Sequence, residues 1–212
     1  MRRAESFSDG VFAVAITVLV FNLLPIAKRG ITGHELWQQA WPQYAGYIVS
    51  FLTIGIMWLN HHTVLSHVRK VDRITLVLNL ALLMTVVAVP FPTALVADNL
   101  GTGPDDPGAK LATVTYGLVM IVMSIAFSGL WAYLSSHATR LGGRPSVASV
   151  QLWVRFSAGG LGYVIGVLLA AFWRPAVALA LYGAVAVYYM FEHLPEPSSE
   201  ADSTSQDQLL ES

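Results

Sequence analysis

The sequence contains no cysteine, and only 12% of its 212 residues are charged. Without cysteine there can be no disulfide framework, no thiolate metal site and no cysteine nucleophile. Soluble domains carry about 25% charged residues, whereas this chain combines few charges with 55% hydrophobic residues. A water-soluble fold of this size would leave large apolar patches exposed. The composition therefore predicts a protein whose surroundings are a lipid bilayer.

The sequence also lacks the residue patterns that are characteristic of several functional classes. The net charge is −1, and no block of basic residues beside aromatics offers a track for phosphates, so we predict no nucleic-acid partner. No serine–histidine–acid order, paired carboxylates or phosphate loop stands out, so we predict no enzymatic activity and no cofactor. His62 and His67 are spaced i, i+5 and do not share a helical face, so we predict no metal site.

Six apolar runs reach or approach the roughly 20 residues that a membrane-crossing helix needs. We therefore predict an all-α membrane protein with six transmembrane helices per chain. A proline after Arg174 suits the first turn of a new helix and divides the last two runs, and a re-entrant hairpin there is the weaker alternative. The runs cover residues 7–26, 44–60, 74–97, 111–134, 156–173 and 176–191.

We predict a multi-pass protein of the cell inner (plasma) membrane, and the loop charges predict its orientation. Lysine and arginine collect on the cytoplasmic side, and six spans divide those residues eight to four, which places both termini in the cytoplasm. Ser8 and Asp9 interrupt the start of the first run, so we expect it to remain in the mature protein rather than act as a signal peptide. Residues 1–193 form the predicted six-helix transmembrane domain, and residues 194–212 a polar tail that we expect to be disordered.

Asp9 is an ionisable group at the membrane edge, which indicates either an ion pathway or an ion pair. The alternative interpretation is helix capping, because Ser6 and Asp9 stand three residues apart, as in a capping box. We weigh capping or a structural polar network about two to one against direct contact with a permeating ion.

Beyond Asp9, one face of the first helix carries Val14, Thr17, Val18 and Phe21 at spacing i, i+3, i+4 and i+7. Within a single helix bundle, such a face normally packs against neighbouring helices. If identical copies met around an axis on this face, they would instead stack apolar rings with one ring of hydroxyls. Hydrophobic rings gate by dewetting, and hydroxyls replace part of an ion's hydration shell.

A second polar cluster closes the second apolar run and contains Trp58, Asn60, His61 and His62. Interfacial histidine and tryptophan more often bond to neighbouring helices than bind metal. We expect this cluster to hold the Arg3–Asp9 segment of the first helix by charge-assisted hydrogen bonds.

Two shorter patterns carry less weight. The string Thr113-Val-Thr-Tyr-Gly117 is similar to a potassium filter, but Thr115 stands at the central glycine position and no pore helix precedes it, so we interpret it as transmembrane helix. Gly162 and Gly166 form a small-xxx-small pattern that favours close helix packing.

The stretch Phe7-Ser-Asp-Gly-Val-Phe-Ala-Val-Ala-Ile-Thr17 resembles prokaryotic members of the transmembrane protein 175 family, which are relatives of the endolysosomal potassium channel. The resemblance continues, in order, through 50–62, 71–73, 78–80 and 90–95. It covers the first hundred residues closely, whereas the later half agrees only in hydropathy and helix number.

The resemblance implies a homotetrameric cation channel that favours potassium, with six helices per chain and a pore formed by the first helices. It places Val14 on the narrowest hydrophobic ring, Val18 and Phe21 on the next rings, and Thr17 on a hydroxyl ring. The Phe-Ser-Asp motif implies a structural polar network between the first two helices. Its members here would be Arg3, Phe7, Ser8, Asp9, Trp58, Asn60 and one or both of His61 and His62.

Three departures from the family pattern bear on ion selectivity. Val14 and Val18 replace larger aliphatic residues, Phe21 introduces an aromatic ring, and Asn22 stands where many relatives have an acidic residue that would attract cations. Two other functions stay open at this point. One is a proton- or cation-coupled transporter that uses Asp9 and the histidines as relays, and the other is a non-conducting membrane scaffold.

Overall fold

Every secondary-structure element in the described part of the chain is a helix. The computed structural model describes residues 2–24, 34–66, 68, 70–100, 103, 106–139, 141 and 149–191, without the side chains of 2, 34–39, 149–158 and 191. The predicted tail, residues 194–212, and His67 lie outside these residues. The elements are α1 (Arg2–Val18), η1 (Leu19–Leu23), α3 (His34–Ser66), α4 (Arg73–Ala88), α5 (Pro90–Asn99), α6 (Pro107–Ser136), α7 (Ser149–Phe172) and α8 (Pro175–Phe191).

Four helical stretches in the described residues are long and apolar enough to cross a membrane: Arg3–Leu23, Ala40–Ser66, Arg73–Asn99 and Pro107–Ser136. The fifth and sixth predicted spans correspond to the shorter apolar helices Gly159–Phe172 and Pro175–Met190. The break between them falls at Trp173 and Arg174, and Pro175 opens α8 as its sequence position indicates. The all-α membrane class is confirmed, and the number of full crossings stays a prediction.

The first helix begins earlier than its hydropathy indicates. α1 starts at Arg2, so Ser6 lies inside the helix and Asp9 lies two turns from its start. The capping interpretation of Ser6 and Asp9 is therefore wrong, because a capping residue precedes the first helical turn. At the other end the helix tightens into the 3-10 turn η1 before Leu24.

Prolines shape the second and third spans. Pro42 lies inside α3, which extends well beyond the predicted run at both ends. Pro90 opens α5 directly after α4, since a proline cannot donate the backbone hydrogen bond that continues a helix. The Val86 carbonyl, which an amide at position 90 would otherwise serve, accepts from the Val89 amide at 3.1 Å. One turn later the Thr93 amide and hydroxyl both donate to the Val89 carbonyl, at 3.2 and 2.8 Å.

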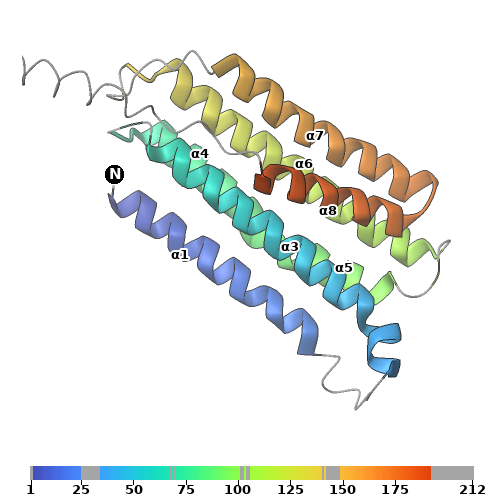
Figure 1. Ribbon diagram of the computed structural model, residues 1–212. Coiled ribbons are helices and arrows are strands. Elements are labelled where there is room, and N and C mark those ends of the chain that lie inside the picture. The colour runs from blue at the N-terminus through green and yellow to red at the C-terminus, as the bar shows by residue number, and fades with distance from the viewer. Residues whose placement is uncertain are drawn as a thin grey trace, which may run out of the picture.

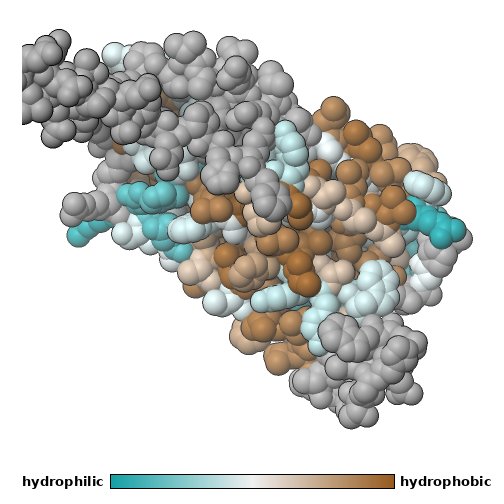
Figure 2. Space-filling model, in the orientation of Figure 1, coloured by the Kyte–Doolittle hydropathy of each residue, from teal (hydrophilic) through white to brown (hydrophobic). Residues whose placement is uncertain are grey.

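The helices form a bundle with α1 along one edge and α7 along the opposite edge (Figure 1). Large side chains fill the interior around α6, among them Tyr116, Met120, Phe127 and Tyr182. The visible surface is hydrophobic across the middle of the molecule, with hydrophilic residues toward its two ends (Figure 2). This distribution suits a bundle whose middle faces hydrocarbon.

The string from Thr113 to Gly117 is regular helix within α6. The Thr113 hydroxyl donates to the Ala109 carbonyl at 2.9 Å, so the segment does not adopt the extended backbone of a carbonyl filter. The interpretation of this string as transmembrane helix is confirmed.

Candidate functional site: the exposed face of α1 and its polar anchor

The helix α1 has two chemically different faces. Ser8, Phe12 and Ala15 are buried at 0–2% exposure on the side where α1 packs against α3 and α4, and Leu19 of η1 is buried in line with them. The opposite face carries Val14 and Phe21, whose side chains are 59% and 60% exposed. Thr17 lies between them and is also exposed, and Val18 is half-buried at the margin. The predicted stripe therefore lies on the side of α1 that its own chain leaves uncovered.

The Thr17 hydroxyl donates to the Val14 carbonyl at 2.9 Å. A hydroxyl has one hydrogen and two lone pairs, so this bond fixes the side chain without consuming its acceptor capacity. The Thr17 oxygen can therefore still coordinate a cation on the exposed face. The neighbouring valine and phenylalanine side chains offer no such oxygen.

On the buried face, α1 is joined to α3 and α4 by a chain of side-chain hydrogen bonds. The Asn79 amide of α4 donates to the Ser8 hydroxyl at 2.9 Å, and the Asn79 carbonyl oxygen lies 2.7 Å from His61 Nε2 of α3. The Ser8 hydroxyl donates in turn to the Ala4 carbonyl at 2.9 Å. All three side chains are at most 3% exposed. Asn79 of α4 thus links α1 and α3 through hydrogen bonds.

Two carboxylates of α1 extend this anchor. The Trp58 indole nitrogen donates to the Asp9 carboxylate at 2.8 Å. The Glu5 carboxylate lies 3.7 Å from His62 Nδ1. A hydrogen bond to an ionised acceptor is stronger than a neutral one, so Asp9 is positioned chiefly by α3.

Three of the predicted network residues lie elsewhere. Phe7 is 55% exposed on the stripe side, because one residue along a helix rotates the side chain by about 100° away from Ser8. Arg3 is exposed and belongs to none of the hydrogen bonds that the structure gives between α1, α3 and α4. Asn60 lines a cavity on the other side of α3.

Sequence reasoning missed Asn79 and Glu5 as members of the anchor. Asn79 had a usable signal, because a buried polar side chain inside an apolar span needs a hydrogen-bond partner. Glu5 gave less indication, because a carboxylate in the first turn of a helix is common without any partner.

The turn η1, at the C-terminal end of α1, has its own attachment. The Asn22 amide in η1 donates to the Pro90 carbonyl at 3.3 Å, at the junction between α4 and α5. A 3-10 turn within a helix marks a place where the backbone tightens. Here it coincides with the segment that carries Phe21, so the orientation of Phe21 depends on η1.

In the single chain, α1 is poorly covered. Within its membrane-length window 22% of residues are buried, against 39% in each of the other three long spans. Within the described residues α1 packs against α3 and α4, and η1 packs against α3 and α5. A helix this exposed, with a hydroxyl on its open face, has a surface available to lipid or to further copies of the chain.

Similarity to known proteins adds a separate line of evidence. Residues 3–90 match the family described as endosomal/lysosomal potassium channel TMEM175. A protein from Streptomyces collinus named potassium channel is 44% identical over 206 residues, which cover 96% of this chain and 98% of the relative. A protein from Chamaesiphon minutus, also named potassium channel, is 37% identical over 166 residues, covering 74% and 78% of the two chains.

The fold is likewise similar to a solved structure. The crystal structure of a lysosomal potassium-selective channel TMEM175 homolog from Chamaesiphon minutus superposes with a TM-score of 0.71 at 28% sequence identity. The superposition covers 89% of this chain and 95% of that chain.

Proposed function

The chain belongs to the TMEM175 family of ion channels, and on that basis we propose that it is a potassium-permeable channel whose pore is formed by the first helices of a homotetramer. The potassium-channel names of the relatives support the ion. The family membership places the chain among channels rather than enzymes. The ions that pass are potassium and other monovalent cations, and no cofactor takes part.

One observation carries the proposal: the exposed stripe of Val14, Thr17 and Phe21 on a helix that its own chain leaves largely uncovered. Four copies related by an axis would bring these residues into rings at successive depths. The Val14 and Phe21 rings would exclude water and form hydrophobic constrictions, with Val18 at the edge of the path. The Thr17 ring would supply hydroxyl oxygens in place of part of an ion's hydration shell.

The anchor on the other face would hold this stripe toward the axis. Asp9 and His61 are held by hydrogen bonds to Trp58 and Asn79. A coupled transporter would need Asp9 and the α3 histidines to exchange partners in each cycle. The bonded positions of Asp9 and His61 therefore support a structural role and favour the channel over the carrier. His62 extends the anchor through its contact with Glu5, whereas Arg3, Phe7 and Asn60 lie outside it.

The proposed topology is six transmembrane helices within residues 1–193, with α7 and α8 as the last two crossings and both termini in the cytoplasm. The protein would lie in the inner (plasma) membrane as a multi-pass protein. The apolar surface across the middle of the bundle supports the membrane setting (Figure 2).

The proposed pore is tested by two substitutions on the stripe. Val14→Asn would place four amides in the narrowest ring, and we expect a more hydrated pathway with higher conductance. Thr17→Ala removes four hydroxyls and little volume, so it should lower the potassium-to-sodium permeability ratio more than the conductance. Single-channel recordings in lipid bilayers measure both quantities.

The matched control is Val77→Asn, because Val77 of α4 is 58% exposed and is an equally apolar position outside the stripe. It should leave the permeability ratio unchanged. Chemical cross-linking and the mass of the purified protein must show four subunits in every variant. Unchanged conductance and selectivity in both stripe variants of an intact tetramer would remove α1 from the pore.

A further inference from the structure

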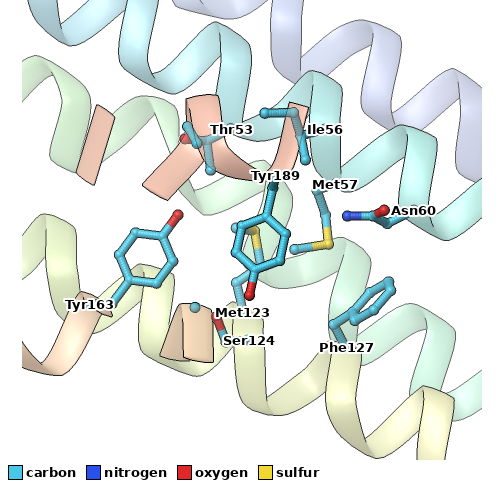
Figure 3. A pocket seen from close by; sticks show the side chains of 11 residues that line it. Thr53, Ile56, Met57, Asn60, Met123, Ser124, Phe127, Tyr163 and Tyr189 are labelled. Carbon is cyan, nitrogen blue, oxygen red and sulfur yellow. The ribbon is translucent and has the colours of Figure 1, made fainter. Parts of the chain in front are cut away.

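A partly open cavity lies inside the subunit, among α3, α6, α7 and α8 (Figure 3). Its volume is about 50 Å³. Since a water-sized group occupies about 10–15 Å³ of such a cavity, a molecule of about three to five non-hydrogen atoms fits inside. The described residues that line the cavity include none from α1, so the cavity is separate from the exposed stripe of the proposed pore.

Asn60 of α3 and Ser124 of α6 give the cavity two available polar groups. Neither side chain makes a hydrogen bond within the part of the chain that the structure describes. Ser124 differs in this from Thr113 and Ser135 of the same helix, whose hydroxyls donate to backbone carbonyls four residues earlier. Figure 3 shows Asn60 on the α3 side of the cavity and Ser124 on the α6 side. Both groups can donate to a ligand hydroxyl and accept from one.

The other polar groups of the wall are already engaged. They belong to Thr53, Tyr163 and Tyr189, each of which has a partner within the chain. The Thr53 hydroxyl, for example, donates to the Val49 carbonyl at 2.8 Å. Hydrogen bonding to a ligand therefore depends chiefly on Asn60 and Ser124.

The remainder of the wall is apolar, and none of the described lining residues carries a charge. Its larger apolar side chains are those of Ile56, Met57, Met123 and Phe127. An ion in this cavity would have no opposite charge to pair with, which makes its removal from water unfavourable. Water beside the two methionines and the phenylalanine would lack the two to four polar partners that a buried water molecule needs. The wall therefore suits a small uncharged molecule with one polar and one apolar end.

We propose that the cavity is a binding site for short aliphatic alcohols, with the ligand hydroxyl bonded to the Asn60 amide and the carbon chain against Met57 and Met123. Propan-1-ol has the size that the volume allows. A ligand of so few atoms binds weakly, with a dissociation constant on the order of millimolar. The site lies within one chain, so it goes beyond the proposed potassium channel and does not depend on it.

The test uses NMR of the full-length protein in detergent micelles, with ¹³C-labelled methionine methyl groups. Of the six methionines, Met57 and Met123 line the cavity, whereas Met84 of α4 is 71% exposed and lies outside it. Propan-1-ol should shift the Met57 and Met123 resonances until they saturate. The Met84 resonance should drift in proportion to the alcohol concentration, because it reports only on the micelle. Each resonance is assigned by its loss when that methionine is replaced by leucine.

Three variants relate the saturation to the cavity. Asn60→Leu removes the amide with little change in volume and should weaken binding about fivefold, the effect of one lost hydrogen bond. Ala186→Leu adds carbon atoms to the cavity wall and should abolish the saturation. Gln43→Met is the matched control, because it removes another amide of α3 that lies outside the cavity, and binding should be unchanged. The charged analogue propylammonium should cause no saturating shift in the parent protein.

The proposal is overturned if propan-1-ol shifts the Met57 and Met123 resonances no differently from that of Met84, because the cavity then holds water alone. It is also overturned if Asn60→Leu and Ala186→Leu bind propan-1-ol as the parent does, or if propylammonium saturates the same resonances. Size-exclusion chromatography and the spread of the methyl resonances show whether each variant is folded. If one cavity variant does not fold, the other decides.

Discussion

At the scale of single residues, the bond between Asp9 and Trp58 has a measurable consequence. Asp9→Ala removes the acceptor of a 2.8 Å hydrogen bond that joins α1 to α3. Because the bond is partly exposed, we expect a loss near the lower end of the range for charged acceptors, about 1.5 kcal/mol. Thermal unfolding in detergent and size-exclusion chromatography should show lower stability and fewer assembled oligomers. Ser6→Ala, a substitution at an exposed neighbouring position, is the control. Normal assembly with sharply altered ion selectivity would instead identify Asp9 as a pore ligand.

Asn79 should be more sensitive than Asp9, although its sequence position attracts less attention. Asn79→Ala leaves both Ser8 and His61 without their partner inside the bundle. A buried polar group left unsatisfied costs about 1–3 kcal/mol, and two such groups are affected. We expect a larger fall in the melting temperature than Asp9→Ala causes. Asn22→Ala, which removes a single 3.3 Å bond, is the matched control and should cost less. Equal effects of the two asparagine variants would contradict the central place of Asn79.

At the scale of helices, α7 and α8 approach closely because glycines remove side chains between them. A methyl group at Gly166 would collide with the Tyr182 ring, and one at Gly162 would meet Val185 at 2.8 Å. The sequence pattern of these two glycines is therefore confirmed as a packing face. Gly166→Ala should destabilise the bundle by about 1–3 kcal/mol through overpacking.

Gly160 provides the control on the same helix. The nearest atom to a methyl group there lies 4.0 Å away, in Ser124. Gly160→Ala should be neutral or stabilising by up to about 1 kcal/mol, since alanine favours helix more than glycine does. The melting temperatures of the two variants in the same detergent measure the difference. A neutral Gly166→Ala would show that Tyr182 moves aside without cost.

At the scale of the whole molecule, the orientation in the membrane can be tested by labelling. The absence of native cysteine means that any introduced thiol is the only one in the chain. We expect Lys70→Cys, in the connection between α3 and α4, to react with a membrane-impermeant maleimide only from the cytoplasm. Asp105→Cys, outside the described residues, should react only from the exterior. The physical reason is the excess of lysine and arginine on the predicted cytoplasmic side. The reverse labelling pattern would invert the proposed topology.

The sequence alone determined the properties that depend on local chemistry. Apolar length predicts the spanning helices, because the bilayer thickness sets how many residues they need. Periodicity puts Val14, Thr17 and Phe21 on one face, because an α-helix repeats every 3.6 residues. The interpretation of residues 113–117 as helix likewise followed from the sequence, because a carbonyl filter has glycine at the position that Thr115 occupies here.

Only the tertiary structure determined which neighbouring helices cover each face of a given helix. The same periodicity could not tell which side of α1 would be covered, and it could not exclude Phe7 from the anchor. Asn79 and Ser8 are 71 residues apart in sequence, and only the packing of α4 against α1 makes them partners. The hydrogen bonds of the Ser50 hydroxyl with those of Thr93 and Tyr116 have the same origin, since the three residues come from three helices. Contacts between distant segments depend on how whole helices pack, and no local pattern of residues contains that information.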